Sequence, residues 1–98
     1  MVKHIVMWNL KEEYANDQEV IANLKSNLEG LVGKVAGLID AKVVIDPIDS
    51  SSRDLALVTT LESKEALANY ASDPSHVAVA DTYVRPFVKD RIALDYND

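Results

Sequence analysis

The nine residues VKHIVMWNL, Val2–Leu10, decide the fold of this chain. They are rich in Val, Ile and other large apolar residues, which is typical of a β-strand. One face of this strand carries Val2, His4, Val6, Trp8 and Leu10, and the other carries Lys3, Ile5, Met7 and Asn9. A strand with one solvated face alternates apolar and polar residues more cleanly than this. The pattern therefore predicts a strand that is covered on both faces.

The other elements follow from the spacing of apolar and capping residues. Helices are expected after Asn16, which has Glu19 three residues on, after Ser63, and after Asp73, which precedes Pro74. Further strands are expected at 38–46, 54–62 and 90–96, joined in part by the serine-rich loop 47–53. The three glycines, Gly30, Gly33 and Gly37, do not form a GxGxxG motif. A nucleotide-phosphate loop is therefore not expected.

The resulting order, β-α-β-β-α-α-β, predicts a ferredoxin-like α+β fold with a four-stranded antiparallel sheet. Its 98 residues fit one domain, 1–98. The helices of such a fold cover one face of the sheet, yet the strands are apolar on both faces. We expect the second face to pack on the sheet of a second copy, giving a homodimeric α+β barrel. The alternative is a monomer with an exposed apolar face.

Composition excludes several classes of function. The chain has no Cys, which excludes disulfides, thiol nucleophiles and thiolate metal sites. Its formal charge of −6 argues against nucleic-acid binding. No apolar run approaches the ~20 residues of a membrane span, and no signal peptide is evident, so we expect no membrane association and a cytoplasmic location.

Three stretches carry a family resemblance: VKHIVMWNLK, LESKEALANYASDPSHVAV and IALDY. They resemble the stress-responsive A/B barrel (Dabb) domain family, and the likeness covers nearly the whole chain. The resemblance implies a dimeric ferredoxin-like barrel. Plant members of this family include heat-stable, stress-induced proteins and a polyketide cyclase, so the resemblance indicates the fold much better than the function.

The candidate catalytic residues are His76 and Tyr70. His76 is expected at about the third residue of the helix after Asp73, and Tyr70 lies just before that helix. We expect both to meet His4 at one pocket between sheet and helices. The helix dipole favours a neutral imidazole at His76, whereas Asp73 opposes it, so the sign of the pKa shift stays open. A tyrosine hydroxyl can donate to a developing enolate oxygen. The resemblance to the cyclase implies that His76 is a general base and Tyr70 its hydrogen-bonding partner.

The candidate lining of this pocket is His4, Val6, Trp8, Leu55 and Tyr83. Leu55 stands where the cyclase has a further histidine, which favours a small apolar or aromatic ligand. Neither a cofactor nor a metal ion is expected, because two distant histidines without a spaced carboxylate make a weak metal signal. Each candidate also has a purely structural interpretation, such as a hydrogen-bonded core histidine or a packed aromatic ring. The tail 95–98 is interpreted as solvated surface.

Three functions stay open. The first is a small-molecule-binding homodimer, with or without cofactor-free proton-transfer chemistry of cyclase or lyase type. The second is a non-catalytic, stress-related structural dimer. The third is a haem- or quinone-type monooxygenase, which the chain resembles through Asn9 and His76, although Asn9 is predicted on the strand face opposite His4.

Overall fold

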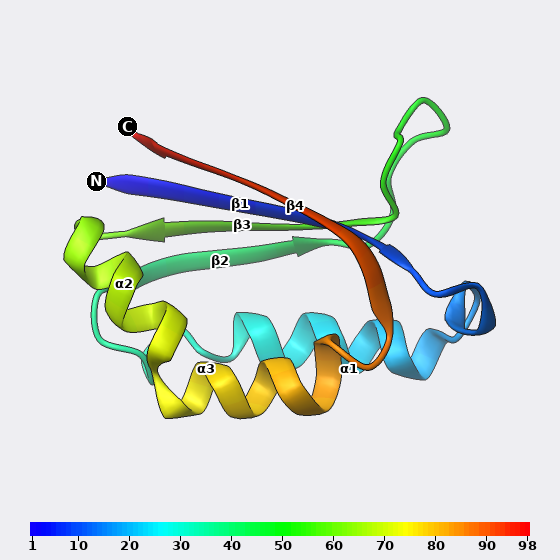
Figure 1. The fold of residues 1–98 in the computed structure, drawn as a ribbon, viewed down its shortest axis with the longest axis horizontal. Coiled ribbons are helices and arrows are strands. Elements are labelled where there is room, and N and C mark those ends of the chain that lie inside the picture. Colours follow the sequence, from blue (N-terminus) through cyan, green and yellow to red (C-terminus); the bar gives the residue numbers. More distant parts are fainter.

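Four antiparallel strands form the sheet in the order β2-β3-β1-β4. In the computed structural model, which describes residues 1–98, the strands are β1 Val2–Leu10, β2 Leu38–Val44, β3 Leu55–Leu61 and β4 Val88–Asn97. The helices are α1 Gln18–Glu29, α2 Lys64–Ser72 and α3 Pro74–Val79, with short turns of helix at η1 Glu12–Tyr14 and η2 Ala80–Val84. All the helices lie on one face of the sheet, and no element covers the other face (Figure 1). The predicted ferredoxin-like α+β fold is confirmed.

Most of the predicted capping residues begin the helices, with one correction. Ser63 accepts a hydrogen bond from the backbone N–H of Ala66, and Asp73 accepts one from Ser75. The helix predicted to begin at Asn16 is instead capped by Asp17, whose carboxylate accepts from Val20. Both residue types suit a cap, and the sequence alone does not choose between neighbours. The prediction of Asn16 was wrong by one residue.

Strand ends also differ from the predictions. β2 ends at Val44, two residues before the predicted limit, because its last partner on β3 is Ala56. β3 is one residue shorter at each end, and β4 is longer, spanning Val88–Asn97. Strand ends depend on pairing between distant segments, which local composition does not report.

The core lies between the sheet and the helices. Val6 and Leu57 of the sheet are 2% exposed, and Leu24 and Leu28 of α1 are 0% and 2% exposed. The apolar side of α1 thus faces the inner side of the sheet, where α1 lies next to β2, as its 3.6-residue periodicity requires. No helix of the chain combines the length and hydropathy needed to cross a membrane.

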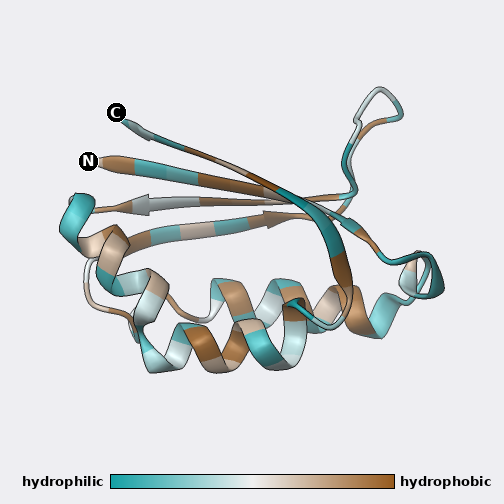
Figure 2. Ribbon diagram, in the orientation of Figure 1, coloured by the Kyte–Doolittle hydropathy of each residue, from teal (hydrophilic) through white to brown (hydrophobic).

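The outer face of the sheet is apolar and open. Brown, hydrophobic segments alternate with teal, hydrophilic ones along β1 and β4 (Figure 2). On β4 the side chains of Ile92, Leu94 and Tyr96 are 46%, 60% and 44% exposed. Three large apolar residues in alternating positions on one edge strand form the kind of patch that isolated monomers seldom expose.

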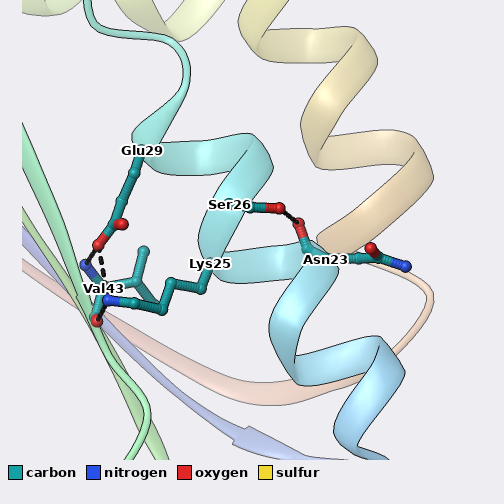
Figure 3. Close-up of polar contacts among 5 residues, drawn as sticks. All are labelled: Asn23, Lys25, Ser26, Glu29 and Val43. Atoms are coloured by element: carbon teal, nitrogen blue, oxygen red, sulfur yellow. Dashed lines mark hydrogen bonds and ion pairs between the residues drawn. The ribbon is translucent and has the colours of Figure 1, made fainter.

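The sheet edge formed by β2 is closed by a pair of charged residues from α1 (Figure 3). Lys25 Nζ donates to the carbonyl of Val43, and Glu29 Oε2 accepts from the N–H of Val43. The two side chains also bind each other, at 2.8 Å. Burial raises the pKa of Glu29, but the hydrogen bonds from Lys25 and Val43 and the charges of Lys25 and Lys42 outweigh it and lower the pKa. The pair protects an edge that could otherwise recruit another strand.

A β-bulge interrupts the pairing of β1 with β4. The register runs regularly to Met7 and Ile92 and resumes at Asn9 and Lys89. Two residues of β4, Asp90 and Arg91, therefore lie opposite the single residue Trp8 of β1. Asp90 has a φ of 56°. The bulge is fixed from two sides, because Asn9 Nδ2 donates to Asp90 Oδ2 at 3.0 Å and Arg53 Nε donates to the Asp90 carbonyl at 3.1 Å. Such bulges redirect the side chains that follow them.

Candidate functional site

A cavity of about 210 Å³ lies between the sheet and the helices. Its lining residues are His4, Val6, Trp8, Leu28, Leu57, Leu67, Tyr70, Ala71, His76, Ala80, Val84, Arg85 and Arg91. A cavity of ~150 Å³ is large enough for benzene, whereas drug-sized ligands need ~300 Å³ or more. The space therefore suits a molecule built around a single ring.

Tyr70 lies between the two histidines on the wall of this cavity. Its ring centroid is 4.2 Å from that of His76, with the planes tilted by 33°. The ring centroid of His4 is 6.2 Å away, in an edge-on arrangement. The break between α2 and α3 produces this cluster, since Asp73 ends one helix and caps the next with Pro74 in its first turn. Three residues predicted to meet are thus brought together, while their chemical roles stay predictions.

His76 has a ring nitrogen without a partner. Its Nδ1 is the one buried side-chain nitrogen or oxygen atom of the chain that lacks a hydrogen bond. Burial lowers the pKa of His76 below its ordinary value, helped by the charges of Arg85 and His4 and opposed by the Ala71 carbonyl and Asp73. The direction of the His76 pKa shift, which the opposing effects of the helix dipole and Asp73 left open, is thus decided mainly by burial. His76 is a neutral imidazole at pH 7, able to accept a proton.

Tyr70 is held as a neutral phenol. The residue is only 2% exposed, and burial raises the pKa of its hydroxyl to about 12. Desolvation is the only cause of this shift, since no protein group hydrogen-bonds to the hydroxyl. A neutral phenol beside a cavity can donate a hydrogen bond to a ligand oxygen.

His4 is fixed by a carboxylate that the sequence reasoning missed. Its Nδ1–H donates to Asp95, which lies directly opposite on β4. A carboxylate can only accept, so the ring nitrogen of His4 that faces Asp95 carries a proton. Asp95 is exposed, as the interpretation of 95–98 as solvated surface requires, but its hydrogen bond to His4 was not predicted. The signal was available only through the antiparallel register, which places residue 95 beside residue 4.

Two arginines on the cavity wall were also missed. Arg85 follows η2 and forms an ion pair with Asp81, and Arg91 follows the bulge of β4. No acidic side chain lines the cavity. The cavity wall therefore combines an apolar surface with two exposed positive charges, of which only Arg85 is held by an ion pair.

Leu55 and Tyr83 do not line this cavity. Leu55 points to the same side of β3 as Leu57 but lies two residues, or ~7 Å, farther along the strand, where it is buried in the core. Tyr83 faces a separate groove with Tyr14 and Phe87.

The cause of the Tyr83 error is the helical turn η2. Its backbone bond from Arg85 N–H to the Ala80 carbonyl spans five residues rather than four. The wider turn moves the inward position from Tyr83 to Val84, which does line the cavity.

The site offers an acceptor at His76, a donor at Tyr70 and an oriented imidazole at His4. No three His, Cys, Asp or Glu side chains lie close enough together to hold a metal ion. Asn9, the residue shared with the monooxygenase pattern, is engaged outside the cavity: its oxygen accepts from the Asp54 N–H and its amide holds the bulge. This arrangement suits proton transfer on a ring-sized molecule.

The chain matches known proteins along its whole length. The family model described as the stress responsive A/B barrel domain (Dabb) matches residues 2–98. A curated relative, a stress-response A/B barrel domain-containing protein of Arabidopsis thaliana, is 31% identical over 97 residues, which is 98% of this chain. The match covers 36% of that relative, so this chain spans about a third of its length.

Solved structures share the fold. A dimeric ferredoxin-like protein of unknown function from Bacteroides fragilis is 23% identical, with a TM-score of 0.88 over 99% of this chain and 95% of that one. A hydroxynitrile lyase from Passiflora edulis is 19% identical, with a TM-score of 0.80 over 97% and 90% of the two chains. At these identities the likeness concerns the fold. Several of the structural neighbours are dimeric. The family match and the curated relative together establish that this chain belongs to the stress responsive A/B barrel domain (Dabb) family.

Proposed function

We propose that the protein is a homodimer that binds a small apolar or aromatic molecule in the cavity and transfers a proton on it without a cofactor. His76 is the general base and Tyr70 the hydrogen-bond donor. The observation that carries this proposal is the placement of the His76 imidazole, whose buried Nδ1 has no hydrogen-bond partner, beside Tyr70 on the wall of a ring-sized cavity. Buried polar atoms are nearly always hydrogen-bonded, so an exception beside a cavity points to a ligand group as the missing partner.

The proposed step is the removal of a proton from the carbon next to a carbonyl group. The neutral imidazole of His76 takes the proton, and the electron pair of the broken C–H bond moves to the carbonyl oxygen as an enolate. The Tyr70 hydroxyl donates to that oxygen as its charge develops. Return of a proton from the imidazolium to carbon completes an exchange. Alternatively, the enolate carbon attacks a second carbonyl, and the imidazolium protonates the alkoxide that forms, which completes an aldol-like closure.

The test uses acetophenone, a single-ring ketone with exchangeable α-hydrogens. Its deuterium uptake in D₂O is followed by proton NMR, with and without the protein. We expect saturable exchange that falls about 100-fold in His76→Gln and about 10-fold in Tyr70→Phe, in line with the 10²–10⁴-fold usual for positioned acids and bases.

Ser75→Ala is the matched control, because Ser75 neighbours His76 on α3 but is exposed and does not line the cavity. Its exchange rate should equal that of the wild type. Equal rates in the wild type, His76→Gln and the protein-free buffer would refute the proton-transfer role.

The dimer rests on the open apolar face of the sheet. The side chains of Ile92, Leu94 and Tyr96 are exposed, and the description of several structural neighbours as dimeric supports a second copy as their cover. If the exchange assay fails while the protein proves dimeric, the non-catalytic structural dimer is the function that stands.

A further inference from the structure

We propose that Arg91 and Arg85 form an anion-binding site at the cavity wall, and that the ligand is a small aromatic carboxylate. This inference rests on the function proposed above and names the class of molecule that the cavity takes. The carboxylate would bind the two guanidinium groups, while the ring occupies the apolar space beside Trp8 and Leu57.

Arg91 lies on the inner side of β4, directly beside the bulge. Without the extra residue, regular pairing would continue past Ile92 and Arg91 alone would oppose Trp8. The bulge inserts Asp90 there with a φ of 56°, a backbone conformation that non-glycine residues rarely adopt. Asn9 and Arg53 hold Asp90 through hydrogen bonds of 3.0 Å and 3.1 Å. A strained backbone feature that is fixed from two sides and lies beside a cavity-lining residue is typical of binding sites.

The distribution of arginine supports the same site. The chain has three arginines among its ten basic residues. Two of them, Arg85 and Arg91, line the cavity, and the third, Arg53, supports the bulge. None of the seven lysines lines the cavity. Arginine is the residue that binds carboxylates through two parallel hydrogen bonds, which lysine cannot do.

Only one of the two charges at the site is paired within the chain. Arg85 is paired with Asp81 on its own helical turn, but Arg91 has no carboxylate within ion-pair distance. The lining contains no acidic residue although the chain as a whole carries a charge of −6. A positive site kept free of acids in an acidic protein selects anions. The volume of about 210 Å³ limits the anion to one ring with a small substituent.

The test compares benzoate with its neutral analogue benzamide, using calorimetry and the imidazole NMR signals of His4 and His76 at pH 7 and constant ionic strength. We expect benzoate to bind at least tenfold more tightly than benzamide. Arg91→Gln should weaken benzoate binding at least tenfold and leave benzamide unchanged. Lys89→Gln is the control, because it removes the same charge from β4 two residues away, outside the cavity. It should change the affinity less than twofold.

The other outcomes separate this inference from the function on which it rests. If benzamide binds as well as benzoate and shifts the His76 signals, the cavity takes rings and the anion site is refuted. If Arg91→Gln and Lys89→Gln weaken benzoate equally, overall charge explains the effect and the anion site is again refuted. If inorganic phosphate competes at the same concentration as benzoate, the site takes inorganic anions and the aromatic class is wrong. If neither ring compound binds, both proposals fall.

Discussion

His76 combines burial with a titratable ring, which gives it a testable effect on stability. Its folded pKa lies below the ordinary value of ~6.5 because burial penalises the charged imidazolium. The unfolded chain therefore binds the proton more readily. Folding gains stability from this residue above pH ~6.5 and loses it as the pH falls through the folded pKa, by at most about 1.4 kcal/mol per pH unit.

We predict that the free energy of unfolding of the wild type decreases more steeply than that of His76→Gln between pH 7 and pH 5. Urea denaturation at each pH measures the difference. Ser75→Ala should run parallel to the wild type over this range. Parallel curves for the wild type and His76→Gln would show that His76 is solvated rather than buried.

Asp95 is predicted to stabilise the strand pair through His4. Asp95→Asn removes a charged acceptor from the Nδ1–H of a residue that is 9% exposed, which should cost about 1 kcal/mol, since Asp95 itself is half-exposed. Asp98→Asn, at the exposed end of the same chain segment, should cost almost nothing. Urea denaturation of both variants at pH 7 checks this, and equal stabilities would contradict a specific role for Asp95.

At the scale of residues, the sequence predicts which side chains meet in the site when they are close along the chain or share one strand face. Tyr70 and His76 could be placed together because one helix break separates them, and His4 because its strand face was evident. Asp95 and Arg91 could not be found, since their neighbours depend on the β1–β4 register and on a bulge at Asp90. These features are determined by pairing between the two ends of the chain.

At the scale of elements, the turn into β2 has a strict steric requirement. Gly37 has a φ of +83°, and a Cβ there would lie 2.6 Å from the Cβ of Ala66 on α2. Gly33 has a φ of +90°, but a Cβ there would meet nothing within 4 Å. We predict that Gly37→Ala costs about 3 kcal/mol, through backbone strain and overpacking together. Gly33→Ala should cost about 1 kcal/mol, through strain alone.

Thermal or urea denaturation of the two variants measures that contrast. Because backbone strain is common to both, the difference reports the contact between the turn and α2. Equal losses would mean that α2 moves away to accept the methyl group.

The elements themselves were largely predictable. Capping at Ser63 and Asp73 depends on residues within one turn of helix, and the sequence displays it directly. The wide turn η2 was not predictable, because a bond spanning five residues depends on packing against the core rather than on composition. That single turn accounts for the misplacement of Tyr83.

At the scale of the whole molecule, the open face of the sheet is predicted to hold two copies together. Leu94→Asp places a charge in the middle of the patch formed with Ile92 and Tyr96, and should convert a dimer into a monomer. Val32→Asp is the control, because Val32 is also exposed, at 40%, but lies in the turn after α1 rather than on a strand. Light scattering after size exclusion should give twice the chain mass for the wild type and Val32→Asp. A monomeric wild type would contradict the dimer.

The most direct measurement is the nitrogen NMR spectrum of the His76 imidazole during titration with acetophenone at pH 7. We predict that the free protein shows a neutral imidazole and that its Nδ1 signal moves in a saturable way as the ketone binds, with smaller changes at His4. This result would show a ligand group at the atom that the chain leaves without a partner. An unchanged His76 spectrum, with or without shifts in the separate groove near Tyr14 and Phe87, would contradict the cavity as the functional site.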